Sequence, residues 1–419
     1  MPAETYLKGW GFADVGFVTD SVRSVARAAA GLAPAALVNR VLPPGQRFDW
    51  AHPTPAISPP DADIRVLVAP TNTAWQGWAA ARAAEHLEGV GARTSGIVPA
   101  GGGFGFLSDQ EVPPAEYRWS SRWQRAQRRA VLGGFTHVLL ESGRPLFGDA
   151  FARPVEADIA ALRRAGVSLA LMLYGSEVRL PSRHLARMPD SPFAPGLWSA
   201  TPALEAQALR TAALAAAFDG PVFVATPDLL LDVPEATWLP ITIDPTQWES
   251  ARAAFTHLDG PPIVSHVPSS AVVKGTDLIE PVLTRLHDEG LIRYSPIRGL
   301  KASDMPAAYT GADIVLDQFR IGTYGVAAVE AMAAGRFVIS NVGEQVRGEV
   351  ERQLGETVPI IEATASTFEQ VLRAVVADPE VFRAEVDRGP GFARRHHDGR
   401  RAAEVLSAWL TGSAQKLVD

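Results

Sequence analysis

The strongest constraint on the fold is an alternation of short apolar segments with amphipathic ones, which begins at Ile64 and continues to residue 410. Short buried strands that alternate with helices are typical of βαβ units, and such units build parallel sheets. In the first half of the chain we predict strands at 64–69, 94–98, 136–140, 167–173 and 222–225, and helices at 75–87, 118–132, 155–165 and 203–218.

The alternation stops at residues 237–248, which contain two prolines and predict a crossing between two domains. A chain of 419 residues is long enough for two domains of ordinary size. Two consecutive doubly wound domains place the carboxyl ends of both sheets at a shared cleft, where ligands bind. In the second half we predict strands at 263–267, 292–296, 314–317 and 337–340, and helices at 276–289, 325–334, 366–376 and 392–410.

The first 62 residues precede this pattern and form an extension. Residues 14–41 have helical apolar spacing that is interrupted at Pro34, and residues 42–62 are rich in proline and aspartate and predict a linker. We expect the helix to dock on the first domain, with a membrane-surface role or a contact between two copies of the chain as alternatives. We therefore divide the chain into an extension (1–62), an N-terminal domain (63–243), a C-terminal domain (244–391) and a final segment (392–419).

Composition excludes several classes of function. The net charge of −7 argues against a dedicated nucleic-acid binder. The absence of cysteine excludes disulfides and thiolate chemistry and suits a cytoplasmic protein. The histidines show no metal-binding spacing, and the glycines of residues 101–105 do not form the G-x-G-x-x-G pattern of nicotinamide cofactor sites. We also expect no secretory signal and no transmembrane segment.

Residues 313–340 are the most informative about function. They predict a strand, a turn with two glycines, a helix that begins near Gly325 and a second strand. The backbone N–H groups and the positive end of such a helix favour an anionic ligand. Glu330 lies among apolar residues of this helix, so we expect its carboxylate to be buried and to need a partner, such as a sugar hydroxyl.

The sequence GTYGVAAVEAMAAG at 322–335 resembles the donor-binding signature of GT-B glycosyltransferases, in particular the large retaining family with an E-x7-E motif. Glu330 matches the second Glu, which in that family binds the nucleotide ribose, whereas Gly322 stands at the position of the first. The resemblance implies a GT-B fold of two Rossmann-like domains, with the last helix crossing back to the N-terminal domain. It also implies a diphosphate site at the turn formed by Gly322, Thr323, Tyr324 and Gly325.

The loop after the predicted strand 263–267 contains Lys274, and the resemblance assigns to this lysine the neutralisation of the donor diphosphate. A fixed cation and helix N–H groups stabilise the charge that develops on a leaving nucleoside diphosphate. We therefore predict Lys274 as a catalytic residue, with Ser269 and His266, the only other potentially cationic group of the loop, in the donor site. The alternative is a solvated lysine at a helix start.

The turn YGSEVR at 174–179 follows a predicted strand and resembles the H-G-S-D-x-R turn of these transferases, with Tyr174 at the His position and Glu177 at the Asp position. The resemblance places such residues near the donor sugar or the acceptor. It makes Glu177 a second catalytic candidate and Gly175, Ser176 and Arg179 acceptor-binding candidates. The alternative is a turn that ends the strand, with a surface pair between Glu177 and Arg179.

Two further loops lie at predicted strand ends. Asn72 and Gln76 have polar side chains that suit the recognition of acceptor hydroxyls, although Asn72 is equally suited to cap the next helix. Glu141 and Arg144, beside a glycine, are further acceptor-binding candidates, or they pair with each other.

Arginines recur at helical spacing on one predicted helix, and tryptophans flank them. A solvated face with the tryptophans packed inward is the favoured interpretation. The alternative is attraction to an anionic membrane surface or acceptor, which would place the protein at the inner face of a membrane. The stripe consists of Arg118, Arg122, Arg125 and Arg129.

The resemblance implies transfer of a hexosyl-like group from a nucleotide-sugar to an acceptor hydroxyl, with retention of configuration and without a metal or other cofactor. The acceptor would be a carbohydrate, a lipid-linked sugar or another small molecule. Two alternatives stay open, namely a non-catalytic relative that serves as a partner or scaffold, and another GT-B activity such as that of an epimerase or a phosphorylase.

Overall fold

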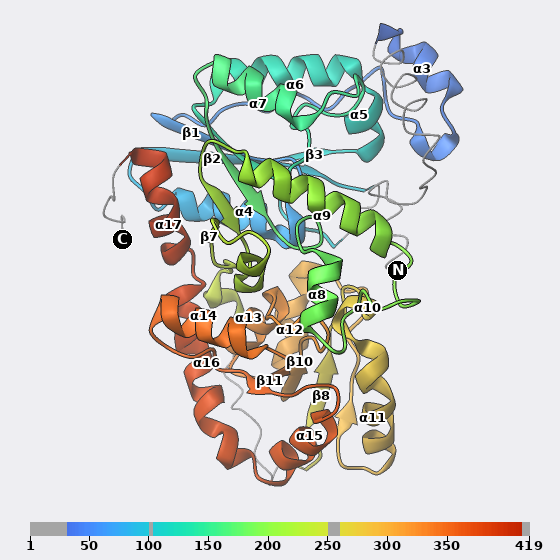
Figure 1. Cartoon of the computed structure of the whole chain (residues 1–419), viewed down its shortest axis with the longest axis vertical. Coiled ribbons are helices and arrows are strands. Elements are labelled where there is room, and N and C mark those ends of the chain that lie inside the picture. The colour runs from blue at the N-terminus through green and yellow to red at the C-terminus, as the bar shows by residue number, and fades with distance from the viewer. Residues whose placement is uncertain (1–31, 100–103, 250–259, 413–419) are drawn as a thin grey trace.

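The computed structural model describes residues 32–99, 104–249 and 260–412, which form two α/β domains (Figure 1). The first sheet has seven strands in the order β3-β2-β1-β4-β5-β6-β7, and the second has five in the order β12-β11-β10-β8-β9. All strand pairs in both sheets are parallel. The predicted class of two doubly wound parallel-sheet domains is confirmed.

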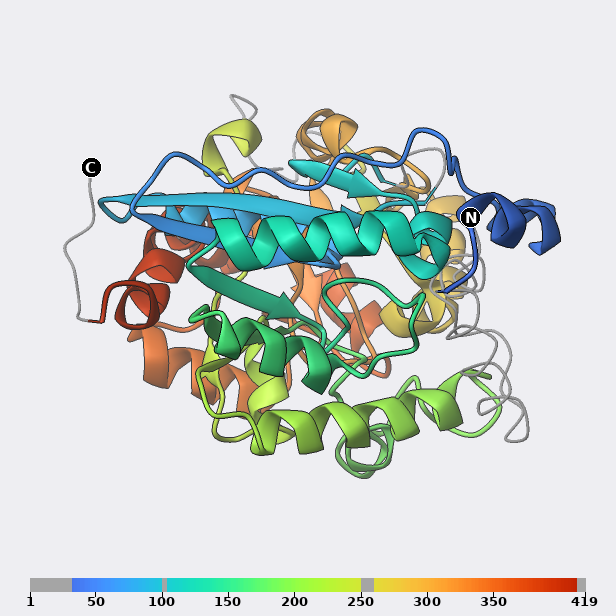
Figure 2. The ribbon, with the colours of Figure 1, turned by 90° about the horizontal axis from the view of Figure 1, so that it is seen from above.

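The N-terminal sheet is covered by helices on both faces, and this explains its apolar strands. Val66 and Val68 of β1 pack on the side of α4, whereas Leu67 packs on the side of α6 and α7, which lie nearest the viewer in Figure 2. The strands are β1 (Ile64–Ala69), β2 (Val90–Ile97), β3 (Gln110–Val112), β4 (His137–Glu141), β5 (Ser168–Leu173), β6 (Val222–Val224) and β7 (Thr237–Trp238). The α-helices are α4 (Gln76–Ala84), α5 (Pro114–Trp119), α6 (Ser121–Gly134), α7 (Val155–Arg164), α8 (Pro181–Arg187) and α9 (Thr201–Ala216).

The C-terminal domain repeats this plan around a shorter sheet. The strands are β8 (Ile263–His266), β9 (Arg293–Tyr294), β10 (Ile314–Leu316), β11 (Phe337–Ser340) and β12 (Ile361–Glu362). The α-helices are α10 (Ala271–Lys274), α11 (Thr276–Asp288), α12 (Met305–Thr310), α13 (Val326–Ala333), α14 (Glu344–Leu354), α15 (Phe368–Ala377) and α16 (Arg383–His396).

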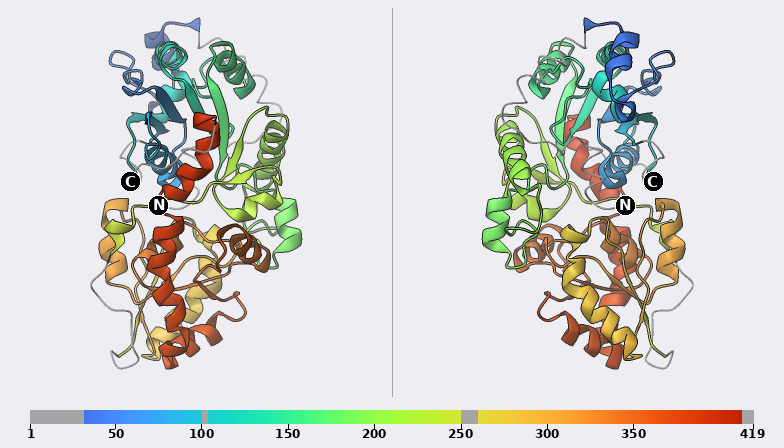
Figure 3. Two further views of the ribbon diagram at one scale, coloured as in Figure 1. Left: turned by 90° about the vertical axis from the view of Figure 1, so that its left-hand side faces the viewer. Right: turned by 90° about the vertical axis from the view of Figure 1, so that its right-hand side faces the viewer.

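The single helix predicted at 392–410 is two helices. Gly399 has a φ of +99°, which ends the helical path between α16 and α17 (Arg400–Thr411). Helix α17 leaves the C-terminal domain and packs on the N-terminal one (Figure 3). There Leu406 joins the cluster that contains Val66, and the Trp409 indole N–H donates a hydrogen bond of 2.9 Å to Ser168 Oγ.

The two connections between the domains run side by side. The Ile243 N–H donates to the carbonyl of His397 at 2.8 Å, and His397 Nδ1 donates to the carbonyl of Ile241 at 2.6 Å. Burial lowers the pKa of His397 to about 4, so its ring is neutral. Gln76 of α4 bonds both the N–H and the carbonyl of Thr242, at 2.8 and 3.1 Å. The predicted crossing therefore lies against the N-terminal domain.

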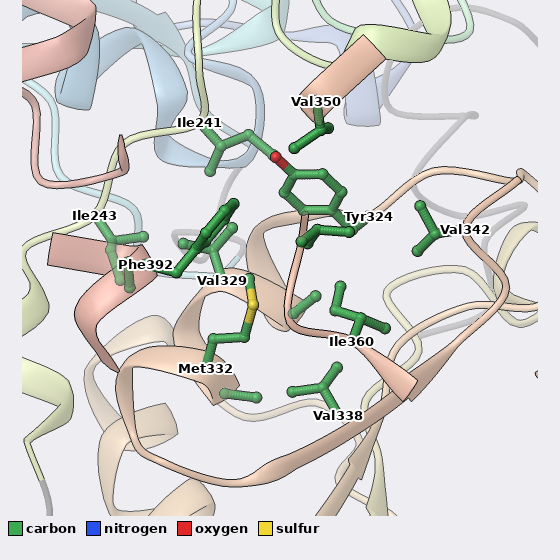
Figure 4. Close-up of a cluster of buried hydrophobic side chains, with 14 of the residues drawn as sticks. Ile241, Ile243, Tyr324, Val329, Met332, Val338, Val342, Val350, Ile360 and Phe392 are labelled. Atoms are coloured by element: carbon green, nitrogen blue, oxygen red, sulfur yellow. The ribbon is translucent and has the colours of Figure 1, made fainter. Parts of the chain in front are cut away.

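Helix α13 is anchored in a core that both domains share (Figure 4). Val329 and Met332 of this helix pack with Phe392 of α16 and with Ile241 of the connecting segment. Because the apolar side of α13 is fixed in this way, the position of Glu330 on its other side is also fixed.

Of the extension, the structure describes only the part from residue 32 onward. Helix α3 (Ala35–Val41) follows Pro34, and Val38, Leu42 and Phe48 pack against Trp119 of α5. The predicted helix at 14–41 otherwise lies outside the described residues. No helix in the part of the chain that the structure describes is long and apolar enough to cross a membrane.

The arginine stripe divides between α5 and α6, which meet at Ser120. Arg122, Arg125 and Arg129 are exposed, whereas Trp123 is buried. The inward-packed tryptophan agrees with a solvated basic face, and contact with a membrane stays a prediction.

Candidate active site

Two neighbouring cavities lie between the domains and share residues at their border, among them Ser269 and Lys274. The smaller cavity, of about 220 Å³, has apolar and aromatic walls from both domains. The larger cavity, of about 360 Å³, contains more hydroxyl and amide groups. Residues of the smaller one include Trp75, Phe104, Phe106, Ile297, Leu300, Met305 and Glu330, and those of the larger one include Gln76, Tyr174, Ser176, Arg179, Thr323, Tyr324 and Gly325.

Glu330 is the one acidic side chain among the described residues that line the smaller cavity. It is only 9% exposed, and no described residue donates a hydrogen bond to its carboxyl group. Burial raises its pKa to about 8. The positive charge of Lys274 acts to lower this pKa, and the negative charge of Asp317 acts to raise it. Burial of a carboxyl group is unfavourable when no hydrogen-bond donor faces it.

The predicted anion position at the start of α13 is occupied by a side chain of the protein itself. Asp317 is fully buried, and its Oδ2 accepts the Gly325 N–H at 3.0 Å. Its Oδ1 accepts a hydrogen bond from Lys274 Nζ, which makes a buried ion pair. Lys274 is thus in the predicted place, beside both cavities and the helix start, but it is already paired with Asp317.

His266 does not contribute a cation to the site. Its Nδ1 donates to the Leu316 carbonyl at 3.1 Å, and its Nε2 accepts from the Thr276 hydroxyl at 2.9 Å. Burial lowers its pKa to about 4, so the ring is neutral. It lines neither cavity. The donor-binding role predicted for His266 does not fit this structure, because its side chain turns into the domain.

The turn before α13 is held by α8 of the N-terminal domain and by the segment that follows this helix. The His184 ring, through Nε2, donates to the Ile321 carbonyl at 3.1 Å, and Arg320 donates to the Asp190 carbonyl at 3.0 Å. A Cβ atom on Gly322 would lie 2.9 Å from the thioether sulfur of Met188. Met188 therefore fills the space into which a glutamate at position 322 would extend.

We predict that Gly322→Glu lowers the melting temperature rather than restoring a donor contact. The φ of +76° disfavours any side chain with a Cβ atom, at a cost of about 1–2 kcal/mol, and the new side chain must also displace Met188. Gly355→Glu is the matched control, since Gly355 has a φ of +74° and open space around its Cβ position. If both variants lower the melting temperature by the same amount, Met188 has no role in the effect.

Glu141, at the end of β4, holds the loop after β1 that contains Asn72, and neither residue lines either of the two cavities. Glu141 is fully buried, and its Oε2 accepts the N–H groups of Thr71 and Asn72 at 2.7 and 2.8 Å. Its Oε1 accepts the Tyr174 hydroxyl at 2.5 Å. Asn72 Oδ1 accepts the Trp78 N–H in the first turn of α4 at 2.9 Å, although the N-cap position of this helix belongs to Trp75. Their predicted acceptor-binding roles do not fit these contacts.

Glu177 closes the turn after β5 rather than facing a substrate. Its carboxylate accepts the N–H groups of Tyr174 and Gly175, at 2.6 and 3.0 Å. Arg179 lines the larger cavity but pairs with Asp228, at 2.6 Å, and not with Glu177. Arg144 lines neither cavity. Neither a catalytic role for Glu177 nor acceptor binding by Arg144 fits this placement.

No known family model matches the sequence, and no curated protein matches it. Solved structures are similar in fold. Sucrose-phosphate synthase from Thermosynechococcus elongatus superposes with a TM-score of 0.53 at 12% identity, over 82% of this chain and 96% of that chain. HepE from Anabaena, solved with UDP and glucose, gives 0.52 at 12% identity over 83% and 99%. A glycosyltransferase from Rickettsia africae gives 0.51 at 10% identity over 83% and 98%. The chain therefore has the GT-B fold that these glycosyltransferases share.

Proposed function

We propose that the protein transfers a glycosyl group from a nucleotide-sugar donor to an acceptor hydroxyl. The observation that carries this proposal is the Glu330 carboxyl, which is buried in the interdomain cavity and receives no hydrogen bond from the described residues. The vicinal hydroxyls of a ribose are suitable donors for it, and they would offset the cost of its burial.

We place the base of the nucleotide in the smaller cavity around Glu330. Trp75 and Phe106 approach from the N-terminal domain, and Ile297 and Leu300 approach from the C-terminal domain. Aromatic and aliphatic walls with few polar groups suit a planar base. HepE was solved with UDP and with UDP-glucose, and this makes a uridine nucleotide the first probe to test.

The glycosyl group then lies in the larger cavity, near Gln76, Ser176 and Thr323. No carboxylate is among the described residues that line this cavity. We therefore propose that the leaving diphosphate accepts the proton of the acceptor hydroxyl. The acceptor oxygen forms a bond to the anomeric carbon while the bond between this carbon and the phosphate oxygen breaks. The proton passes to that phosphate oxygen on the same face of the sugar. This route retains the configuration. Lys274 and the helix start stabilise the departing charge, so the proposal includes no metal ion.

The test is a thermal-shift screen with UDP, GDP, ADP and dTDP. A ligand that binds only the folded protein raises the melting temperature. We expect one nucleotide to stabilise the wild type, to lose its effect in Glu330→Ala, and to keep it in the control Glu351→Ala, whose side chain is exposed on α14. If no nucleotide stabilises a folded wild type, the scaffold alternative replaces this proposal. A free sugar phosphate or an epimer as product would instead indicate a phosphorylase or an epimerase.

A further inference from the structure

The anion position at the start of α13 is filled before any ligand binds. Asp317 accepts the Gly325 N–H and the Lys274 ammonium, and these are the two groups that a donor diphosphate would use under the proposed function, on which this inference rests. A helix N-terminus together with a lysine is an ordinary phosphate site. Here a carboxylate of the protein already uses both parts.

Asp317 cannot easily leave this position. It directly follows β10, and its side chain is completely buried. Its own N–H donates a hydrogen bond to the Ile339 carbonyl of β11 at 3.2 Å. An incoming diphosphate would therefore share Lys274 with Asp317 rather than replace it.

No second free cation compensates for Asp317 among the described residues that line the two cavities. Lys274 is the only cationic side chain of the smaller cavity. The larger cavity adds Arg179, whose guanidinium is paired with Asp228. The positive charge of Lys274 at the diphosphate position is thus balanced by the negative charge of Asp317.

We propose that Asp317 is a positioning residue that holds Lys274 at the start of α13 and limits the affinity for the nucleoside diphosphate product. A lysine without this carboxylate would bind the product more tightly, because like charges a few ångströms apart repel strongly in a partly buried site. Asp317 therefore favours product release, and it does so without touching the sugar.

The test compares the affinities for UDP and UMP in Asp317→Asn, measured by isothermal titration calorimetry. Asparagine keeps an oxygen for the Gly325 N–H and removes the charge. We expect UDP to bind about tenfold tighter or more, and UMP to change much less, since it lacks the second phosphate. A purely structural role of Asp317 would weaken the binding of both nucleotides.

Asp313→Asn is the matched control. Asp313 is also buried, accepts the Ile263 N–H at 2.7 Å, and precedes β10, whereas Asp317 follows it. The backbone positions of the two residues are about 13 Å apart along the strand, so the control should leave the ratio of UDP to UMP affinity unchanged.

Equal or weaker UDP binding by a folded Asp317→Asn protein would overturn this inference and leave the proposed function standing. If UDP, GDP, ADP and dTDP all fail to bind to the wild type and to Asp317→Asn, both this inference and the proposed function are overturned. If the variant does not fold, the wild type decides: we expect its affinity for UDP to exceed that for UMP by less than about tenfold, and a ratio above about a hundredfold would contradict the inference.

Discussion

Glu330→Gln is expected to raise the melting temperature at pH 9 and to leave it almost unchanged at pH 5. The ordinary pKa of a glutamate is 4.5, and burial raises that of Glu330 to about 8. Below pH 4.5 the carboxyl is protonated in both the folded and the unfolded chain. As the pH rises from 4.5 to 8, the unfolded chain loses this proton and the folded chain keeps it, so the free energy of unfolding falls. Glutamine has no proton to lose and escapes this penalty.

The expected effect is large because each unit of pKa difference corresponds to about 1.4 kcal/mol. Several kcal/mol at pH 9 would shift the melting temperature by about 5–10 °C in a chain with domains of this size. Thermal melts at pH 5, 7 and 9 measure it, with the exposed Glu351→Gln as control. A gain of the same size at every pH would show that Glu330 is not protonated in the folded protein.

Lys274→Met is expected to destabilise the protein by about 3 kcal/mol, because it leaves the charge of Asp317 buried without its cation. Lys274 is 13% exposed at its side chain and Asp317 is not exposed at all, so water cannot replace the lost partner. Methionine keeps an unbranched stem of similar length. The measurement is the free energy of unfolding in urea at pH 7.

The double variant Lys274→Met/Asp317→Asn provides the control for this prediction. It removes both charges and keeps a hydrogen-bond acceptor for Gly325, so it should regain much of the stability lost in the single variant. A double variant as unstable as Lys274→Met would show that Lys274 acts through packing and not through its pair with Asp317.

The fold could be predicted because its strands are buried on both faces. In β1 the residues from Val66 to Ala69 are apolar and buried although they point to opposite sides of the sheet, and the same holds for Ile314–Leu316 in β10 and Phe337–Ile339 in β11. Such continuous apolar segments, separated by amphipathic helices, leave few alternatives to a parallel sheet. Helix α14 was not predicted, because Val346 and Val350 are its only buried residues within a strongly charged sequence.

The helix predicted at 392–410 shows a different failure. Apolar spacing continues through the end of α16 and the start of α17, so the periodicity alone gives one helix. The interruption depends on Gly399, whose left-handed backbone packs near Thr242 of the other connection. The need for a glycine at position 399 comes from this tertiary contact, and the apolar spacing within one segment does not reveal it.

Glu330 could be identified from its sequence because a lone carboxylate in an apolar helix is conspicuous. Asp317 could not be identified, although it is the last residue of a predicted strand. Its role depends on Lys274, which lies 43 positions away in the sequence and reaches it because β8 and β10 pair in the sheet. The sequence likewise does not show that the carboxylates of Glu141 and Glu177 accept backbone N–H groups, those of the loop after β1 for Glu141 and those of its own turn for Glu177.

The position of α17 has a consequence for biosynthesis. Ala402, Ala403, Leu406 and Leu410 complete the core around β1 and α4, so the ribosome must make both domains before the first can close its core. The strands of the C-terminal domain and the helices that cover them lie between residues 263 and 396. The domain synthesised first is therefore expected to keep an apolar groove open until α17 has been translated.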